Sequence, residues 1–306
     1  MSAVVGADGG GSGAVYDRGY RPYDGPRGGR RASRSALYRA SLRRALGLRR
    51  SWRQKVSPFV LLGIAVIPAI VNVGVQYLTR NTPASDVEFF TYREYVGVSN
   101  SLLVFVALTA PDLFCPDRRQ HVLPLYFARP LTGIDYVLAK TGALFSILFA
   151  FSFLPQVVLF IGNLLVNEDG SLNYFKANTD VLWKVPVAVA LLSLLFALIG
   201  ASLASLTTRR ITAGASIVGL FLVSSIVSGV LTGDTEAFGY QGSPAALINV
   251  LVLPLYLRDI VFLGHVGTDF PLSGVPNGGA LAALVYAGIV LAAAVILVSR
   301  YREVER

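Results

Sequence analysis

Residues 116 to 135 read PDRRQHVLPLYFARPLTGID, a basic stretch that lies between two long apolar segments. Its apolar positions Val122, Leu125 and Tyr126 have the spacing of a short helix, but they are too few to cross a bilayer. The stretch is therefore predicted to be a loop that contains a helix. A rigid basic helix of this kind either presents a surface to a partner or only joins two spans, and the pattern favours neither.

The ends of this predicted helix have their own signals. Pro116 suits a first helical turn, and Pro130 is expected to stop the helix, because proline lacks the backbone N–H that a helix interior needs. Thr132, followed three residues later by Asp135, has the pattern of a capping box. We expect the next helix to begin there.

The composition is that of a polytopic membrane protein. Of the 306 residues, 54% are hydrophobic and only 15% are charged, too few polar residues to surround a soluble core of this size. Cys115 is the only cysteine, so the chain has no intrachain disulfide and no cysteine metal cluster. His121 and His265 are too few and too far apart to indicate a metal site.

The positive charge is concentrated at the amino terminus. The net charge is +9, and residues 1 to 55 alone hold thirteen lysines and arginines against three aspartates. Such a block either binds nucleic acid or marks the cytoplasmic side of a membrane and contacts anionic lipid. Because it is joined directly to a hydrophobic segment, we favour the lipid and predict no nucleic-acid partner.

Three regions follow from this pattern. Residues 1–34 are rich in glycine, serine, tyrosine and arginine and are predicted to be a disordered basic arm, residues 35–55 an amphipathic helix in the headgroup plane, and residues 56–306 the transmembrane domain. The arm either lies on a partner or is only a basic tail. At helical spacing, the less polar side of the amphipathic helix carries Leu37, Ser41, Ala45, Leu48 and Trp52.

Six apolar segments are each long enough to cross the bilayer core of about 30 Å. They lie at about 58–78, 97–115, 136–166, 181–206, 211–232 and 279–299. With the amino terminus inside, 22 of the 27 lysines and arginines fall on the cytoplasmic side. We therefore expect a multi-pass protein of the cell (plasma) membrane with both termini in the cytoplasm.

Residues 243–264 are apolar, but Pro254 divides them, and Arg258 and Asp259 follow. We predict two half-helices that form a broken re-entrant hairpin before the last span. A seventh span is the alternative, but it would place the carboxyl terminus outside. The predicted fold class is an all-α membrane protein with six transmembrane helices, an N-terminal in-plane amphipathic helix and this hairpin.

The sequence offers no catalytic constellation and no ATPase motif. The only lysine followed by serine or threonine is Lys140, and it lacks the glycine that a Walker A loop requires before it. The chain is therefore predicted not to be an enzyme. Among the few polar residues within the spans, Asn72 and Gln76 share a helical face, and they either line a translocation path or form an interhelical hydrogen bond.

The stretch DRRQHVLPLYFARPLTGIDYVLAK resembles the permease subunits of ABC-2 type transporters. In that family a basic, helix-forming loop is followed by a Pro-Leu-Ser/Thr turn and a Tyr-Val-Leu-x-Lys helix start. Residues 129–132 (RPLT) and 136–140 (YVLAK) match these two elements. The arm motif at residues 19–27 (GYRPYDGPR) is similar to one found in some bacterial members.

The resemblance implies a half-transporter. A second permease copy, identical or related, and two copies of a separate ABC ATPase subunit would complete it, with ATP and magnesium bound on the ATPase and no cofactor on this chain. The resemblance further implies that the loop is a coupling helix resting on the ATPase. Its predicted partner-binding residues are Arg118, Arg119, His121, Leu123, Leu125, Tyr126 and Arg129, and those of a possible partner arm are Tyr20, Arg21, Tyr23 and Arg27.

The expected function is that of the permease of an ABC exporter, which couples ATP hydrolysis on its partner to translocation of a substrate that the sequence does not define. One alternative is a secondary transporter or channel, which would need a charged or multiply polar track within the membrane. The other is a membrane scaffold that works without an ATPase.

Overall fold

The computed structural model describes residues 28–48, 52–79, 91–96, 99–128, 131–167, 170–237 and 242–305. Within these ranges the chain forms helices and connecting turns and contains no strand. A helix pairs its backbone N–H and C=O groups within one segment, which hydrocarbon surroundings require. The protein is an all-α membrane protein, as the sequence predicts.

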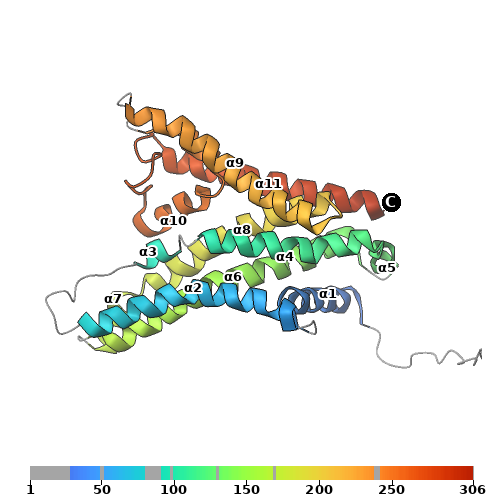
Figure 1. Cartoon of the computed structure of the whole chain (residues 1–306), viewed down its shortest axis with the longest axis horizontal. Coiled ribbons are helices and arrows are strands. Elements are labelled where there is room, and N and C mark those ends of the chain that lie inside the picture. The colour runs from blue at the N-terminus through green and yellow to red at the C-terminus, as the bar shows by residue number, and fades with distance from the viewer. Residues whose placement is uncertain are drawn as a thin grey trace, which may run out of the picture.

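Each of the six predicted apolar segments coincides with a long helix (Figure 1). They are α2 (Trp52–Thr79), α4 (Ser99–Arg119), α6 (Gly133–Val166), α8 (Val181–Leu206), α9 (Arg210–Ala237) and α11 (Gly278–Glu305). Among the described residues, five helices are long and apolar enough to cross a membrane: Phe59–Thr79, Gly133–Val166, Val181–Leu206, Arg210–Gly233 and Gly278–Arg302. The chain is therefore a multi-pass membrane protein.

Helix α4 is not among these five, although it has 21 residues. Its last two turns carry Asp112, Asp117, Arg118 and Arg119, which lower its mean hydropathy. Most of its side chains are buried among its neighbours, so α4 lies inside the helix bundle. This position explains how a helix with four charges near its end is accommodated.

Helix α8 forms the centre of the bundle, since 67% of its apolar stretch is buried, against 17% in α2 and α9 and 22% in α11. Those three helices expose many leucine, isoleucine and valine side chains. In a membrane protein such side chains face lipid or another protein. Four helices, α2, α4, α6 and α8, run side by side, while α9 and α11 cross them at an angle (Figure 1).

Helix α1 (Arg30–Ala45) differs in extent from the amphipathic helix predicted over 35–55. It begins at Arg30, so residues 30–34, predicted to belong to the arm, form its first turn, and it ends where Gly47 adopts a φ of +67°. Only glycine takes this conformation without strain. Leu48 lies beyond this turn and is exposed, which corrects its predicted place on the buried side.

The buried side of α1 otherwise follows the prediction. Leu37 and Ser41 are buried against the bundle, and Ala45 is half-buried. Trp52, the last predicted member, is instead the first residue of α2. Helix α1 packs mainly on α6.

In the described segments between the long helices lie four short ones: α3 (Tyr92–Tyr95), α5 (Leu123–Phe127), α7 (Ser171–Ala177) and α10 (Leu253–Leu263). In Figure 1, α1, α5 and the carboxyl terminus lie at one end of the bundle, which we call the α5 end. Helices α3, α7 and α10 lie at the opposite end, which we call the α10 end.

The apolar stretch at 243–264 is not a single helix. It forms a 3-10 turn over Pro244–Ile248 and then α10, whose 11 residues are about 16 Å long and too short to span. Pro254 does not divide two half-helices as predicted, because it lies in the first turn of α10, where a missing N–H costs no hydrogen bond. The break falls instead between Ile248 and Leu253.

Candidate functional site

The candidate site is the α5 end, and its geometry begins with the end of α4. His121 adopts a φ of +52°, the backbone N–H of Val122 donates to the Asp117 carbonyl (3.2 Å), and that of His121 donates to the Arg118 carbonyl (3.3 Å). This is a Schellman motif with histidine at the position that glycine usually takes. It turns the chain sharply, so that α5 folds back onto the bundle end.

The prediction that Pro116 lies in the first turn of the short helix is wrong. Pro116 lies inside α4, which continues to Arg119. The proline at the start of α5 is Pro124, in its first turn. Helix α5 ends at Phe127, and Pro130 lies outside the described residues. The capping box at the start of α6 is confirmed: the Thr132 side chain accepts from the Asp135 N–H, and the Asp135 side chain accepts from the Thr132 N–H.

Helix α5 has one outward and one inward side. Leu125 is 70% exposed, whereas Leu123 is 5% exposed and is packed into the core. The rings of Tyr126 and Phe127 pack on that of Tyr136 in α6, with centroid separations of 5.8 and 6.4 Å. The exposed Leu125 thus belongs to a helix whose inner side is held on α6 by aromatic contacts.

The predicted partner-binding residues therefore divide into two groups. Arg119, His121 and Leu125 are exposed at the end of the bundle. Leu123 and Tyr126 face inward, and the Arg118 guanidinium donates to the Ser205 carbonyl, which ties α4 to α8. Arg129 lies outside the described residues, as do all four residues of the possible partner arm, Tyr20, Arg21, Tyr23 and Arg27.

Beneath α5 lies a buried polar cluster centred on Asp117 of α4. This carboxylate accepts hydrogen bonds from the Lys140 ammonium, from the Tyr136 hydroxyl (3.1 Å) and from the Arg44 guanidinium (3.0 Å). The side chains of Asp117 and Lys140 are each only 2% exposed. A buried charge of this kind is tolerated because it is paired and hydrogen-bonded.

The Asp117 cluster joins four helices at one point. Arg44 belongs to α1, Asp117 to α4, and Tyr136 and Lys140 to α6. Tyr301 of α11 packs its ring on that of Tyr136, with centroids 4.8 Å apart. These contacts link the four helices to one another at the α5 end.

Sequence reasoning missed this cluster. It considered Lys140 only in excluding a Walker A loop and, with Tyr136, as part of the YVLAK motif, and it assigned no role to Asp117. The available signal was an aspartate in the last turn of one apolar segment and a lysine in the second turn of the next. Opposite charges at such positions favour each other when both are withdrawn from water.

A second set of contacts holds α1 against α6. The Arg30 guanidinium pairs with the capping carboxylate of Asp135, and Arg34 lies 3.8 Å from the same carboxylate. The hydroxyls of Tyr38 and Ser146 are hydrogen-bonded at 2.8 Å. Helix α1 is thus fixed at its start, middle and end.

The two residues proposed for a translocation path lie elsewhere, on α2. Asn72 is buried, and Gln76 is half-buried. Because α2 packs mainly on α6, both belong to the layer at one side of the bundle.

At the α10 end a second buried ionic cluster was also missed. Asp259 of α10 is fully buried and accepts from Arg93 of α3 (2.8 and 2.9 Å), from Arg258 and from the Gly267 N–H. Arg258 in turn donates to the Arg93 carbonyl (3.0 Å). These bonds fix α10 to the short helix before α4.

The fold and these two clusters define the class: a helical, multi-pass membrane protein in which buried ion pairs hold the helices together at both ends of the bundle. No protein-family model matches the chain, and no curated protein matches it.

Proposed function

We propose that this chain is the permease subunit of an ATP-binding cassette exporter, and that a separate ATPase subunit docks on α5. The observation that carries the proposal is the two-sided character of α5. Its outward residue Leu125 is an apolar side chain with no cover within the described chain, and its inward residues are packed on α6. An exposed leucine beside Arg119 and His121 is the kind of small apolar surface with a polar rim that a partner protein covers.

The contacts behind α5 support a mechanical role. A displacement of α5 acts through Tyr126 and Phe127 on Tyr136, and through Tyr136 on the helices that meet at Asp117. Packed side chains of this kind transmit a rigid-body movement, whereas a flexible loop would absorb it. Helix α6 has 34 residues and carries the movement across the full depth of the membrane.

The proposed topology has six spans, with α4 as the second, and places both termini and the α5 end in the cytoplasm. The positive-inside distribution of lysine and arginine supports this orientation. In this arrangement α10 and the turn before it enter the outer side of the membrane without crossing it, and the basic helix α1 lies along the inner headgroups. The functional unit contains a second permease copy and two ATPase copies.

The docking surface is tested by co-purification of an ABC ATPase subunit with the tagged chain from its native membranes. We expect Leu125→Glu to reduce recovery of the ATPase at least tenfold, because a charge at the centre of an apolar contact is left without water. Leu172→Glu on α7 is the matched control, since Leu172 is 74% exposed and lies at the opposite end. Undiminished recovery with Leu125→Glu would contradict the docking role.

The orientation is tested by cysteine labelling in a Cys115→Ser background. Gln120→Cys, at the α5 end, is expected to react in intact cells with a membrane-permeant maleimide and not with an impermeant one. Ser171→Cys, in α7, is expected to react with both. The reverse pattern would place the α5 end outside and refute the proposal.

A further inference from the structure

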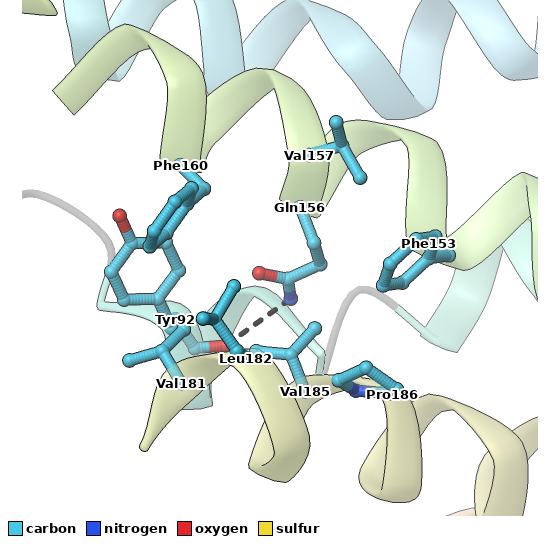
Figure 2. A pocket seen from close by; sticks show the side chains of 9 residues that line it. All are labelled: Tyr92, Phe153, Gln156, Val157, Phe160, Val181, Leu182, Val185 and Pro186. Atoms are coloured by element: carbon cyan, nitrogen blue, oxygen red, sulfur yellow. Dashed lines mark hydrogen bonds between the residues drawn. The ribbon is translucent and has the colours of Figure 1, made fainter. Parts of the chain in front are cut away.

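A pocket opens between α6 and α8 in the half of the bundle toward the α10 end. Phe153, Gln156 and Phe160 of α6 line one side, the first turns of α8 from Val181 to Pro186 line the other, and Tyr92 of α3 closes the end (Figure 2). The pocket has a volume of about 180 Å³. An apolar cavity of about 150 Å³ is enough for a benzene ring.

The walls are apolar and carry no charge. Among the nine lining residues only Tyr92 and Gln156 have polar side-chain atoms, and the Tyr92 hydroxyl is hydrogen-bonded to that of Tyr174 at 2.6 Å. A charged ligand would leave its ion unpaired in such surroundings. The ligand must therefore be neutral and mainly apolar.

One polar atom of the pocket, the side-chain amide oxygen of Gln156, is without a hydrogen-bond partner in the described part of the chain. Gln156 is 2% exposed, and its side chain points from α6 toward Tyr92 and α8 (Figure 2). Its amide nitrogen donates to the Tyr92 carbonyl at 3.2 Å, which fixes the orientation of the group. The amide oxygen then has no hydrogen-bond partner among the residues that the structure describes.

A carbonyl oxygen is an acceptor, so what it lacks is a donor. Water is a poor candidate, because a buried water needs two to four polar partners and this pocket offers one free acceptor. A ligand that fills the apolar space and carries a single O–H or N–H group satisfies both requirements at once.

We propose that this pocket binds a small neutral apolar group bearing one hydrogen-bond donor, of about the size of a phenol, with the donor on the Gln156 oxygen. Two sources have this chemistry: the hydroxylated part of a bilayer lipid, and a small hydroxylated solute that enters from the membrane. The proposal does not depend on an ATPase. A result that refutes it would leave the proposed function unchanged, and the reverse also holds.

The test uses the full chain in phosphatidylcholine nanodiscs and a pair of photoactivatable probes. One probe is a phenol that carries a small alkyl diazirine, and the other is its methyl ether, which has nearly the same shape but no donor. Labelled residues are identified by mass spectrometry. We expect the phenol to label residues 153–160 and 181–186 about threefold to tenfold more than the ether, the range expected for one hydrogen bond.

Variants assign the preference to the proposed atom. Gln156→Leu removes the acceptor and is expected to make the two probes label equally. Ser193→Ala is the matched control, because Ser193 is a buried residue of α8 whose hydroxyl also lacks a partner but does not line the pocket. It should leave the preference unchanged, while Val185→Phe, which fills the pocket, should reduce labelling by both probes.

Competition distinguishes the two sources. Diacylglycerol has a free hydroxyl and triacylglycerol has none, so displacement of the phenol probe by the first alone identifies a bilayer lipid. Displacement by neither, with the phenol preference intact, identifies a small solute. The comparison of the two probes is made on the unmodified chain, so it does not require any variant to fold. Equal labelling of that chain by the phenol and the ether overturns the proposal. Displacement by both lipids, or a preference that survives Gln156→Leu, also overturns it.

Discussion

Arg93 and Asp259 lie 166 residues apart and form a two-bond ion pair, with N–O distances of 2.8 and 2.9 Å. The carboxylate is fully buried, and Arg258 donates to it as well. This pair joins the segment before α4 to the helix before α11. This ion pair and the hydrogen bond from Arg258 to the Arg93 carbonyl thus connect two distant parts of the chain.

Removing the charge of Asp259 is therefore expected to be costly. Asp259→Asn leaves the buried Arg258 without its anion and leaves Arg93 with only the exposed Asp269. We expect a loss of about 3 kcal/mol in the free energy of unfolding, measured in mixed detergent micelles. Asp269→Asn is the control, because Asp269 also pairs with Arg93, at 3.3 Å, but is 74% exposed. Its loss should be below about 1 kcal/mol. Equal effects of the two variants would contradict the buried role of Asp259.

The same carboxylate predicts a dependence on pH. Burial raises the pKa of Asp259, but hydrogen bonds from Arg93 and Arg258 outweigh burial, so the pKa lies below its ordinary value of 3.8. A group with a lowered pKa stabilises the fold above its ordinary pKa, and this stabilisation is lost as the pH falls through the folded value.

We therefore expect the difference in unfolding temperature between the unmodified chain and Asp259→Asn to be constant from pH 7 to about pH 5 and to shrink below about pH 4. Unfolding scans at intervals of half a pH unit measure this difference. A difference that grows on acidification would give the wrong sign and refute the assignment.

Lys140 and Asp117 provide a third prediction, at the α5 end. Lys140→Met leaves a buried carboxylate with less compensation, and we expect it to cost about 3 kcal/mol of unfolding free energy. Lys184→Met serves as the control, because Lys184 pairs with Asp180, which is half exposed, and should cost less than about 1 kcal/mol.

A double-mutant cycle isolates the pair. Lys140→Met combined with Asp117→Leu should cost less than the sum of the two single changes, because the second change removes the charge that the first leaves unpaired. Additive losses would show that Lys140 contributes through packing alone.

Gly162 allows α2 and α6 to approach closely. A Cβ atom at Gly162 would overlap with the Val73 side chain, whereas a Cβ at Gly74 would meet open space. Gly162→Ala is expected to destabilise by about 1–3 kcal/mol, and Gly74→Ala to be neutral or slightly stabilising. Val73→Ala in the Gly162→Ala background should restore part of the loss. No effect of Gly162→Ala on unfolding would contradict the described packing.

Structural features that depend on residues close together in the chain could be predicted from the sequence, whereas those that depend on distant residues could not. The capping box of Thr132 and Asp135 was predicted because both halves of it lie within one helical turn. The end of α4 was placed too early, at Pro116, because a proline in the chain does not reveal whether the helix continues past it. The start of α1 was placed too late, at residue 35, because Arg30 is held by Asp135, 105 residues away in the chain.

The candidate site was predicted in part. The basic loop was identified, but its residues were treated alike, and the division of Leu125 from Leu123 and Tyr126 appears only when α5 folds back on Tyr136. The clusters around Asp117 and Asp259 were missed for the same reason. Which charges meet depends on how helices rotate and slide against each other, and an unaligned sequence contains no record of that register.

The sequence alone determined that this protein is a helical, multi-pass membrane protein, because stretches of 20 or more apolar residues have no stable place in water and must satisfy their backbone as helices. The tertiary structure alone decided which charged groups neutralise one another inside the bundle. It also decided that Leu125 faces outward and that the Gln156 oxygen meets no hydrogen-bond donor within the described ranges. Burial and pairing are properties of residues brought together from distant parts of the chain, and only packing brings them together.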